Sequence, residues 1–171
     1  MIITITKGSV YHHQAFGVVP YIQLVGYPHA AMQLYGWWQW TRGSNGEGGR
    51  PVVGATAREV GAGLAVAALW SVGLGLLMAT VTEAAYPWPD ATLTAFSLLA
   101  QLWMALKRWQ CWVLWIVVDT LYVAFFAFQE YWLTAGLYGL FTLLAVMGLR
   151  EWRRARAVAQ TAEPPIPSRA L

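Results

Sequence analysis

Aromatic and polar side chains recur at helical spacing between residues 112 and 129. At 100° per residue they share one stripe about 100° wide. The aliphatic residues of the segment lie outside this stripe and include Val113, Ile116, Val117, Leu121, Val123 and Ala124. The stripe consists of Trp112, Trp115, Asp119, Tyr122, Phe126 and Gln129. A carboxylate with aromatic faces on its own side suits a flat cationic ring, because each aromatic face attracts a cation by about 0.5 to 2 kcal/mol. We expect Asp119 to offset the charge of such a ligand.

A second polar row precedes this stripe, at spacings of three and four residues. The row consists of Asp90, Thr94, Ser97, Gln101, Met104 and Arg108. The hydroxyl and amide groups of Thr94, Ser97 and Gln101 can hydrogen-bond ligand hydroxyls, such as those of a ribose. A shorter row follows the stripe and consists of Thr134, Tyr138 and Thr142. Three neighbouring helices with facing polar rows predict a wet or ligand-filled centre.

Each pattern also has a purely structural interpretation. Aromatic stripes commonly pack helices together, and Asp119 could be a protonated hydrogen-bonding group. The hydroxyls and amide of the second row could join helices, at under about 1 kcal/mol each. The stripes nevertheless coincide on consecutive segments, which helix packing alone does not require. We therefore favour a binding site.

The elements that carry these rows must lie in a membrane. The chain of 171 residues is 58% hydrophobic and 11% charged, whereas soluble domains hold about 25% charged residues. This composition excludes an ordinary soluble globule and a disordered chain. A net charge of +3 is too small and too scattered for a nucleic-acid-binding protein. We expect an all-α membrane protein.

Five segments are long and apolar enough to be considered as spans, since a bilayer core needs roughly 20 apolar residues of helix. They are residues 18–40, 61–81, 88–106, 111–128 and 131–149. Lys and Arg residues number 1 before the first span, then 3, 0, 2 and 0 in the connections and 5 after the last. This alternation is what the positive-inside rule requires of five spans with a cytoplasmic C-terminus.

The remaining segments complete the predicted organisation. Residues 1–17 lack the basic and apolar regions of a signal peptide and form an N-terminal segment without assigned structure. Residues 18–160 form the transmembrane domain, with a flexible linker at 44–49. Residues 161–171 contain three prolines and are predicted to be a disordered cytoplasmic tail.

Catalysis finds little support in the sequence. The histidines lack a third ligand at a sensible spacing, so we expect no metal site. A glycine-rich stretch at 46–54 lacks the Gly-Lys-Ser/Thr ending of a Walker A motif, and no hydrolase triad or HExxH grouping occurs. An intramembrane enzyme using Asp119 would need a second acid or base deep within a span, whereas Asp90, at the start of residues 88–106, is expected to lie at the membrane interface. We therefore expect neither an enzyme nor a bound cofactor.

Several short motifs occur together in the region from Tyr27 to Arg154. They are Gln33-Leu34-Tyr35-Gly36-Trp37-Trp38-Gln39-Trp40, Ser97-Leu98-Leu99-Ala100-Gln101, Lys107, Trp112-x-x-Trp115-x-x-x-Asp119, Tyr138 and Gly148-x-x-x-Trp152. With these motifs the chain resembles the PnuC-type vitamin transporters, best known for nicotinamide riboside. The Gly-x-x-x-Trp spacing, at both Gly36 and Gly148, indicates two related halves.

The resemblance implies a fold similar to that of SWEET sugar carriers, in which a linking helix joins two parallel three-helix repeats. Residues 61–81 would be the linker helix and the last three spans the second repeat. Residues 18–40 would be the third helix of a first repeat, of which only this remnant is present. About twenty residues precede its motif, where the family has two further spans, so the first two transmembrane helices are expected to be missing.

The resemblance also implies facilitated diffusion of a vitamin precursor through the bacterial inner membrane, with nicotinamide riboside as the first candidate. A cytoplasmic kinase would trap the vitamin, and the carrier would be a homotrimer. Trp112 and Trp115 would stack on the base, and Gln101 and Asp119 would be polar partners of the ligand. The first repeat would add Gln33, Tyr35 and Trp37. The residue pattern adds Thr94, Ser97, Tyr122 and Tyr138 to the substrate-binding set.

Three alternatives stay open. Thiamine is also a flat cation, so the charge argument does not separate it from nicotinamide riboside. Riboflavin is neutral and would suit a neutralised Asp119. A carrier that lacks part of a repeat could instead be a non-transporting membrane subunit.

Overall fold

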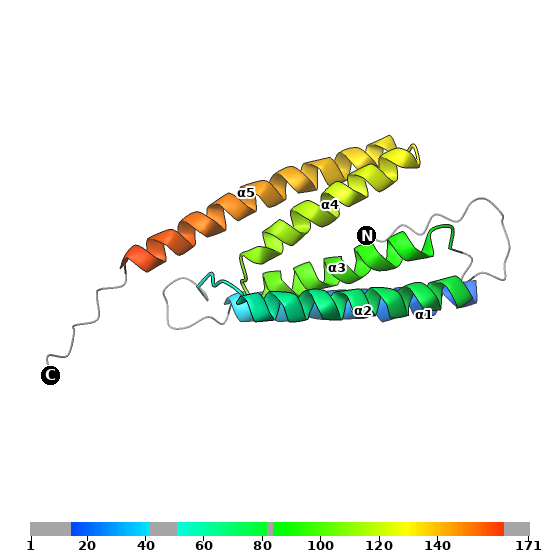
Figure 1. Cartoon of the computed structure of the whole chain (residues 1–171), viewed down its shortest axis with the longest axis horizontal. Helices are drawn as coiled ribbons and strands as arrows, with labels where there is room; N and C mark the ends of the chain where they lie inside the picture. The colour runs from blue at the N-terminus through cyan, green and yellow to red at the C-terminus, as the bar shows by residue number, and fades with distance from the viewer. Residues whose placement is uncertain (1–14, 42–50, 82–83, 163–171) are drawn as a thin grey trace, which may run out of the picture.

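The computed structural model describes residues 15–41, 51–81 and 84–162, and its named elements in these ranges are all helices. They are α1 (Ala15–Thr41), α2 (Ala57–Val81), α3 (Pro87–Ala105), α4 (Gln110–Phe128) and α5 (Trp132–Ala162) (Figure 1). Each predicted span coincides with one helix. By length and composition α2, α4 and α5 can cross a membrane. The prediction of an all-α membrane protein is confirmed, while crossing by α1 and α3 stays a prediction.

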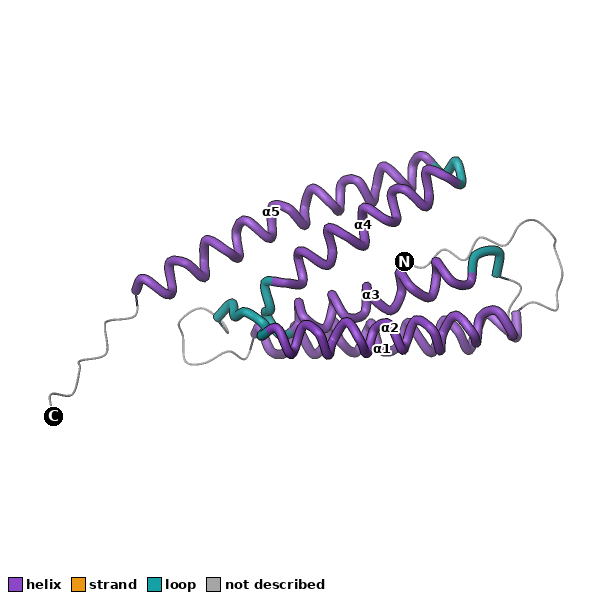
Figure 2. The backbone as a smooth tube through the Cα atoms, in the orientation of Figure 1, coloured by secondary structure: helices purple, strands orange, loops and turns teal. Residues whose placement is uncertain are grey.

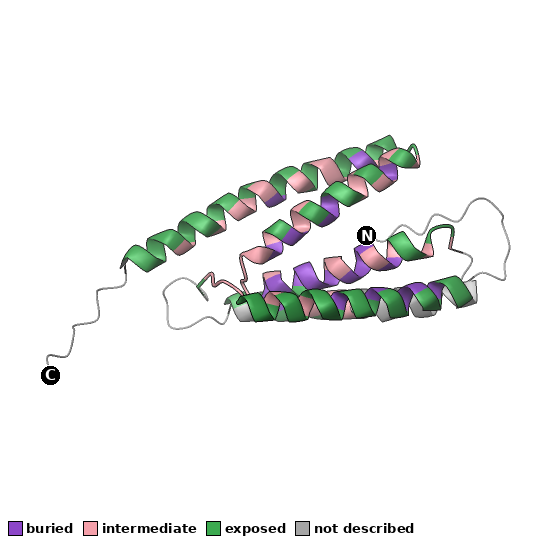
Figure 3. Ribbon diagram, in the orientation of Figure 1, coloured by how far each residue is buried: buried purple, intermediate pink, exposed green. Residues whose placement is uncertain are grey.

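The helices form two groups. Helices α1 and α2 each pack against α3 and form a layer with it. The α4–α5 pair lies on one side of this layer and is inclined to it (Figures 1 and 2). Helix α3 packs against α1, α2 and α4, and it is accordingly the most buried helix (Figure 3). The main core joins both groups and consists of Ala67, Leu93, Leu99, Ala100, Trp103, Cys111, Leu114 and Val118. The two groups therefore meet along α3 and α4.

Close packing of α2 on α3 depends on small residues. A Cβ on Gly75 would lie 2.6 Å from the ring of Trp88, so only glycine admits that indole. Pro87 begins α3, where its fixed φ suits the first helical turn. The hydroxyls of Ser71 and Thr92 hydrogen-bond between the two helices at 2.8 Å. These contacts fix the position of α3 in the layer.

The turns after α3 and α4 repeat one geometry without glycine. Lys107 and Glu130 have left-handed φ angles of 52° and 63°. After α3, the N–H of Lys107 donates to the carbonyl of Met104 and that of Arg108 to the carbonyl of Trp103, as in a Schellman motif. Because α3 ends at Ala105, Arg108 does not continue the helical polar row that the sequence predicted for it.

Basic side chains gather at one end of the bundle, which we call the basic end. At this end α1 stops, α2 begins, α3 turns into α4 and α5 stops. The bridge between Val53 and Arg108 and the ring contact of Trp40 with Trp152 join these termini. Its described basic residues are Arg58, Lys107, Arg108, Arg150, Arg153, Arg154 and Arg156. At the opposite end, described residues 84–90 and 128–132 contain no Lys or Arg. The basic connections predicted from the sequence therefore share one end.

Three predicted segments lie wholly or partly outside the described residues. They are the N-terminal segment up to residue 14, the linker at 44–49 and the tail from residue 163. Helix α5 continues to Ala162, so it includes the first two residues of the segment 161–171 that we predicted as a tail. Alanine and arginine, which favour helix, are frequent after Glu151 and extend α5 past its apolar part.

Candidate functional site

The stripe on α4 lies on the side of the helix that faces the protein, as the sequence predicts. All six of its members, from Trp112 to Gln129, are buried or half-buried. On the other side of the helix, Val113, Val117 and Leu121 are 43%, 50% and 51% exposed. The polar and aromatic face of α4 is thus turned toward the protein, and its aliphatic face is turned outward.

Buried polar side chains concentrate on α3 and α4. The described residues include four of them, namely Ser71, Thr94, Gln101 and Asp119. The last three belong to the predicted substrate-binding set, and Ser97 on the same helix is half-buried. Burial of a polar group is costly unless a partner satisfies it. These positions therefore need partners, either from the protein or from a ligand.

Asp119 lies at a buried position, where an ionised carboxylate is energetically unfavourable. Its side chain is 4% exposed, and in the described part of the chain it forms no ion pair with Lys, Arg or His. A buried carboxylate without a cationic partner is unfavourable. A cationic ligand would supply that partner.

Three aromatic rings stack beside Asp119 and join α4 to α5. The ring centroids of Tyr122 and Tyr138 are 4.5 Å apart with an interplanar angle of 21°. Phe126 stacks on Tyr138 at 5.4 Å and on Tyr122 at 5.9 Å. Since Tyr122 and Phe126 are one helical turn apart on α4, Tyr138 reaches both from α5. This stack fixes the two helices at the level of the carboxylate.

Trp112 is held by both residues of the second Gly-x-x-x-Trp motif. A Cβ on Gly148 would lie 2.7 Å from three ring atoms of Trp112, so the indole rests on the bare backbone of α5. The ring of Trp152 meets it edge-on at 5.4 Å and 88°. The structural interpretation thus accounts for part of what Trp112 does. Its stacking on a ligand stays a prediction.

Trp115 has a different environment. Its side chain is half-buried against the main core, and among the described residues no aromatic ring stacks on it. Its indole N–H is buried and has no hydrogen-bond partner among the described residues, and the same holds for the indole N–H of Trp112 and the hydroxyl of Thr94. An unsatisfied buried polar group costs about 1 to 3 kcal/mol. Three predicted site residues therefore carry polar groups that a ligand or water could satisfy.

The predicted α1 residues are not brought to this site. Trp37 is 73% exposed and Gln33 is also exposed. Helix α1 packs on α3, and Gly36 provides that contact, because a Cβ there would lie 3.3 Å from the Cβ of Ala105. Within the single chain, Gln33 and Trp37 thus lie apart from the stripe on α4.

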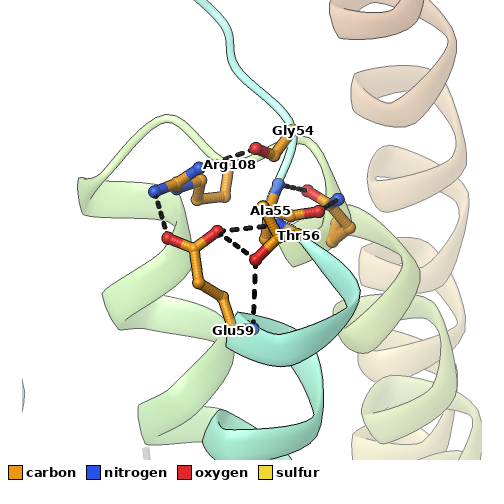
Figure 4. A network of polar contacts seen from close by, with 6 residues as sticks. Gly54, Ala55, Thr56, Glu59 and Arg108 are labelled. Carbon is orange, nitrogen blue, oxygen red and sulfur yellow. Dashed lines mark hydrogen bonds and ion pairs between the residues drawn. The ribbon is translucent and has the colours of Figure 1, made fainter.

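Sequence reasoning missed a polar network at the basic end, in which residues of the α1–α2 connection contact the α3–α4 turn (Figure 4). One signal was available, since Thr56-x-x-Glu59 has the spacing of a capping box. Nothing in the sequence indicated that Arg108 and Gln110 would bind this connection. As for metals, the described residues contain no group of three His, Cys, Asp or Glu side chains that could hold an ion.

The comparison with known families decides to which family the chain belongs. Residues 14–154 match the model of the nicotinamide mononucleotide transporter family. The chain belongs to this family. The expected resemblance to PnuC-type transporters is therefore confirmed, and a transporter family accords with a protein that is not an enzyme.

Two curated relatives in this comparison are named for different substrates. The riboflavin/roseoflavin transporter RibM of Streptomyces davaonensis is 32% identical over 125 residues, which are 71% of this chain and 59% of the relative. The nicotinamide riboside transporter PnuC of Escherichia coli is 28% identical over 89 residues, which are 52% of this chain and 37% of the relative. The chain thus spans less than two thirds of the length of either relative. No solved structure matches it.

Proposed function

We propose that the chain is a membrane carrier for a flat, ribose-bearing vitamin precursor, with nicotinamide riboside as its first candidate substrate. Movement is by facilitated diffusion, without a covalent step or a bound cofactor. The carrier resides in the bacterial inner membrane with its basic end in the cytoplasm, as the positive-inside rule favours. It works as a homo-oligomer, with the trimer of PnuC-type carriers as the first candidate.

The buried carboxylate of Asp119 is the observation that carries this proposal. It is 4% exposed and has no cationic partner in the described residues. Nicotinamide riboside bears a permanent positive charge on its pyridinium ring. Binding of that ring beside Asp119 pairs two charges in a medium of low dielectric, where such a pair is stronger than in water.

The neighbouring groups suit the rest of the ligand. The indole of Trp115 offers a face to the pyridinium, and cation–π attraction adds to the carboxylate's effect. On α3, Gln101 and Thr94 are buried, and the Thr94 hydroxyl has no partner in the described part of the chain. These groups can hydrogen-bond ribose hydroxyls. Ser97, Tyr122 and Tyr138 complete the proposed set.

Riboflavin is the second candidate, because the RibM relative covers 71% of this chain. Its isoalloxazine ring is flat but neutral, so Asp119 would have to bind it in the protonated form. The ribityl hydroxyls could use the same polar groups on α3. The charge of the ligand thus separates the two candidates.

A binding and uptake panel tests the proposal. The purified chain is titrated with nicotinamide riboside, thiamine and riboflavin, and is then reconstituted in liposomes to measure entry of each labelled compound down its gradient. We expect nicotinamide riboside to bind most tightly and to enter without ATP. Preference for riboflavin would favour the second candidate. Binding without entry would identify a non-transporting subunit, and binding of none of the three would contradict the proposal.

A further inference from the structure

Residues 53–59, which we call the strap, are bound to the α3–α4 turn through their backbone. The N–H of Val53 donates to the carbonyl of Lys107 at 3.0 Å, and the N–H of Trp109 donates to the carbonyl of Val53 at 3.2 Å. Val53 and Arg108 thereby form an isolated parallel bridge. Backbone pairing of this kind ties the entry to α2 directly to the link between α3 and α4.

The side chains of Arg108, in the turn, and Gln110, the first residue of α4, reinforce this attachment (Figure 4). The guanidinium of Arg108 donates to the carbonyl of Gly54 at 2.6 Å and to the carboxylate of Glu59 at 2.7 Å. The amide of Gln110 accepts from the N–H of Ala55 and donates to its carbonyl, both at 3.0 Å. Each side chain therefore grips the strap at two atoms, a geometry that fixes orientation as well as distance.

The strap is also held by hydrogen bonds within itself, at the end where it enters α2. The Thr56 N–H donates to the Glu59 carboxylate at 2.7 Å, and the Glu59 N–H donates to the Thr56 hydroxyl at 3.2 Å. This reciprocal pair is a capping box that begins α2. One carboxylate thus caps α2 and binds Arg108. The start of α2 and the α3–α4 turn cannot separate without loss of that shared contact.

The α3–α4 turn is the covalent link between the two helix groups. Residues 106–109 connect α3 in the layer to α4 in the inclined α4–α5 pair (Figure 1). Helix α5 also reaches this point, since the Arg153 guanidinium lies 5.4 Å from the ring centroid of Trp109. A few residues at the end of an element commonly act as a hinge between rigid groups.

From these contacts we propose that the strap, together with the core between α3 and α4, holds the angle between the α1–α2–α3 layer and the α4–α5 pair, with the α3–α4 turn as the hinge. Release of Arg108 and Gln110 from the strap leaves only the packing between the two groups to hold this angle, and the pair then also adopts a second angle about the turn. In a carrier, a change of this angle opens and closes the two sides of the membrane in turn; this last role rests on the proposed function, whereas the mechanical role does not.

Distance measurements between spin labels test the mechanical role. Val81 at the end of α2 and Leu133 at the start of α5 are 59% and 91% exposed and lie at the end away from the strap, where a hinge motion is largest. Both are replaced by labelled cysteines. Cys111 is buried, and the unmutated chain should take up no label. Pulsed electron–electron double resonance then gives the distribution of distances between the two spin labels, and thus between the layer and the pair.

Three variants are compared with the labelled parent. Arg108→Ala combined with Gln110→Ala removes both grips. Glu59→Gln removes the ion pair but keeps a capping side chain, since glutamine also suits that position. Ser71→Ala is the matched control, because it removes a hydrogen bond between α2 and α3 outside the strap.

We expect a single narrow distribution for the parent and for Ser71→Ala. The double variant should show a second population, shifted by more than the width of the parent peak, and Glu59→Gln should show the same population at a lower fraction. Circular dichroism checks helix content; should the double variant lose it, Glu59→Gln alone decides. Strap variants that reproduce the parent distribution would overturn the proposal. Uptake is measured separately, so a failure of transport would not be confused with a failure of the hinge.

Discussion

The rings of Trp40 and Trp152 meet at the basic end, with centroids 6.0 Å apart and planes tilted by 56°. These tryptophans end the two Gly-x-x-x-Trp motifs of the chain, one on α1 and the other on α5. In each motif the glycine lies against the next packed element, Gly36 against Ala105 and Gly148 against Trp112. The two motifs therefore converge in one contact, which supports the hypothesis of two related halves.

Replacement of Gly148 by alanine should destabilise the α4–α5 pair. The added methyl would lie 2.7 Å from the Trp112 ring, and overpacking of this kind costs about 1 to 3 kcal/mol. We expect a lower midpoint of thermal unfolding in detergent. Gly139→Ala is the control on the same helix, because nothing lies within 4 Å of its added methyl. It should leave the midpoint unchanged or raise it, since alanine favours helix. Equal midpoints for both variants would contradict the close contact of Gly148 with Trp112.

Glu130→Gly should stabilise the chain. Glu130 has a φ of 63°, and a left-handed conformation costs a residue with a Cβ about 1 to 2 kcal/mol. Glycine removes this cost, although its own entropy offsets part of the gain. Thermal unfolding in detergent should show a higher midpoint for Glu130→Gly but no gain for Glu130→Ala, which keeps the Cβ. An equal gain for both would mean that the carboxylate, rather than the backbone, is responsible.

Asp119→Asn should separate the two candidate substrates. The amide keeps the size of the side chain but removes its charge, so nicotinamide riboside should bind at least about tenfold more weakly, equivalent to about 1.4 kcal/mol. Riboflavin is neutral, and any affinity for it should be nearly unchanged. Titration calorimetry of both ligands measures the difference. An unaltered affinity for nicotinamide riboside would show that Asp119 is not its counter-charge.

Tyr138 should act through its ring. It stacks on Tyr122 at 4.5 Å and on Phe126 at 5.4 Å, and these stacks are retained in Tyr138→Phe but lost in Tyr138→Ala. We expect the alanine variant to lose stability and ligand affinity together and the phenylalanine variant to keep both, as shown by thermal unfolding and titration. A phenylalanine variant as impaired as the alanine variant would assign the role to the hydroxyl.

Local patterns in the sequence were sufficient to predict the helices and the side of α4 that is buried. The period of the α4 stripe correctly separates the buried side of Asp119 from the exposed side of Val117, because burial of a helix follows its angular position. The basic end was likewise predictable, since charge placement depends on the membrane and not on detailed packing. The fold class follows from composition alone.

Contacts between distant segments were not predictable from these patterns. Gly148 signals a close approach, but only the structure identifies Trp112 as the side chain that rests on it. Arg108 was assigned to a helical row, whereas the left-handed Lys107 ends that helix and directs Arg108 to Gly54 and Glu59. A turn of this kind without glycine has no clear sequence signal.

Binding of nicotinamide riboside to Trp115→Ala tests the central proposal most directly. Trp132→Ala is the control, because this tryptophan on α5 is 69% exposed, and Trp115→Phe keeps an aromatic face. All three are first shown to be folded by thermal unfolding and size-exclusion chromatography. We expect that Trp115→Ala loses detectable binding, that Trp115→Phe binds weakly and that Trp132→Ala binds as the parent does. A folded Trp115→Ala variant with the parent's affinity would contradict the proposed stacking of the substrate on this indole.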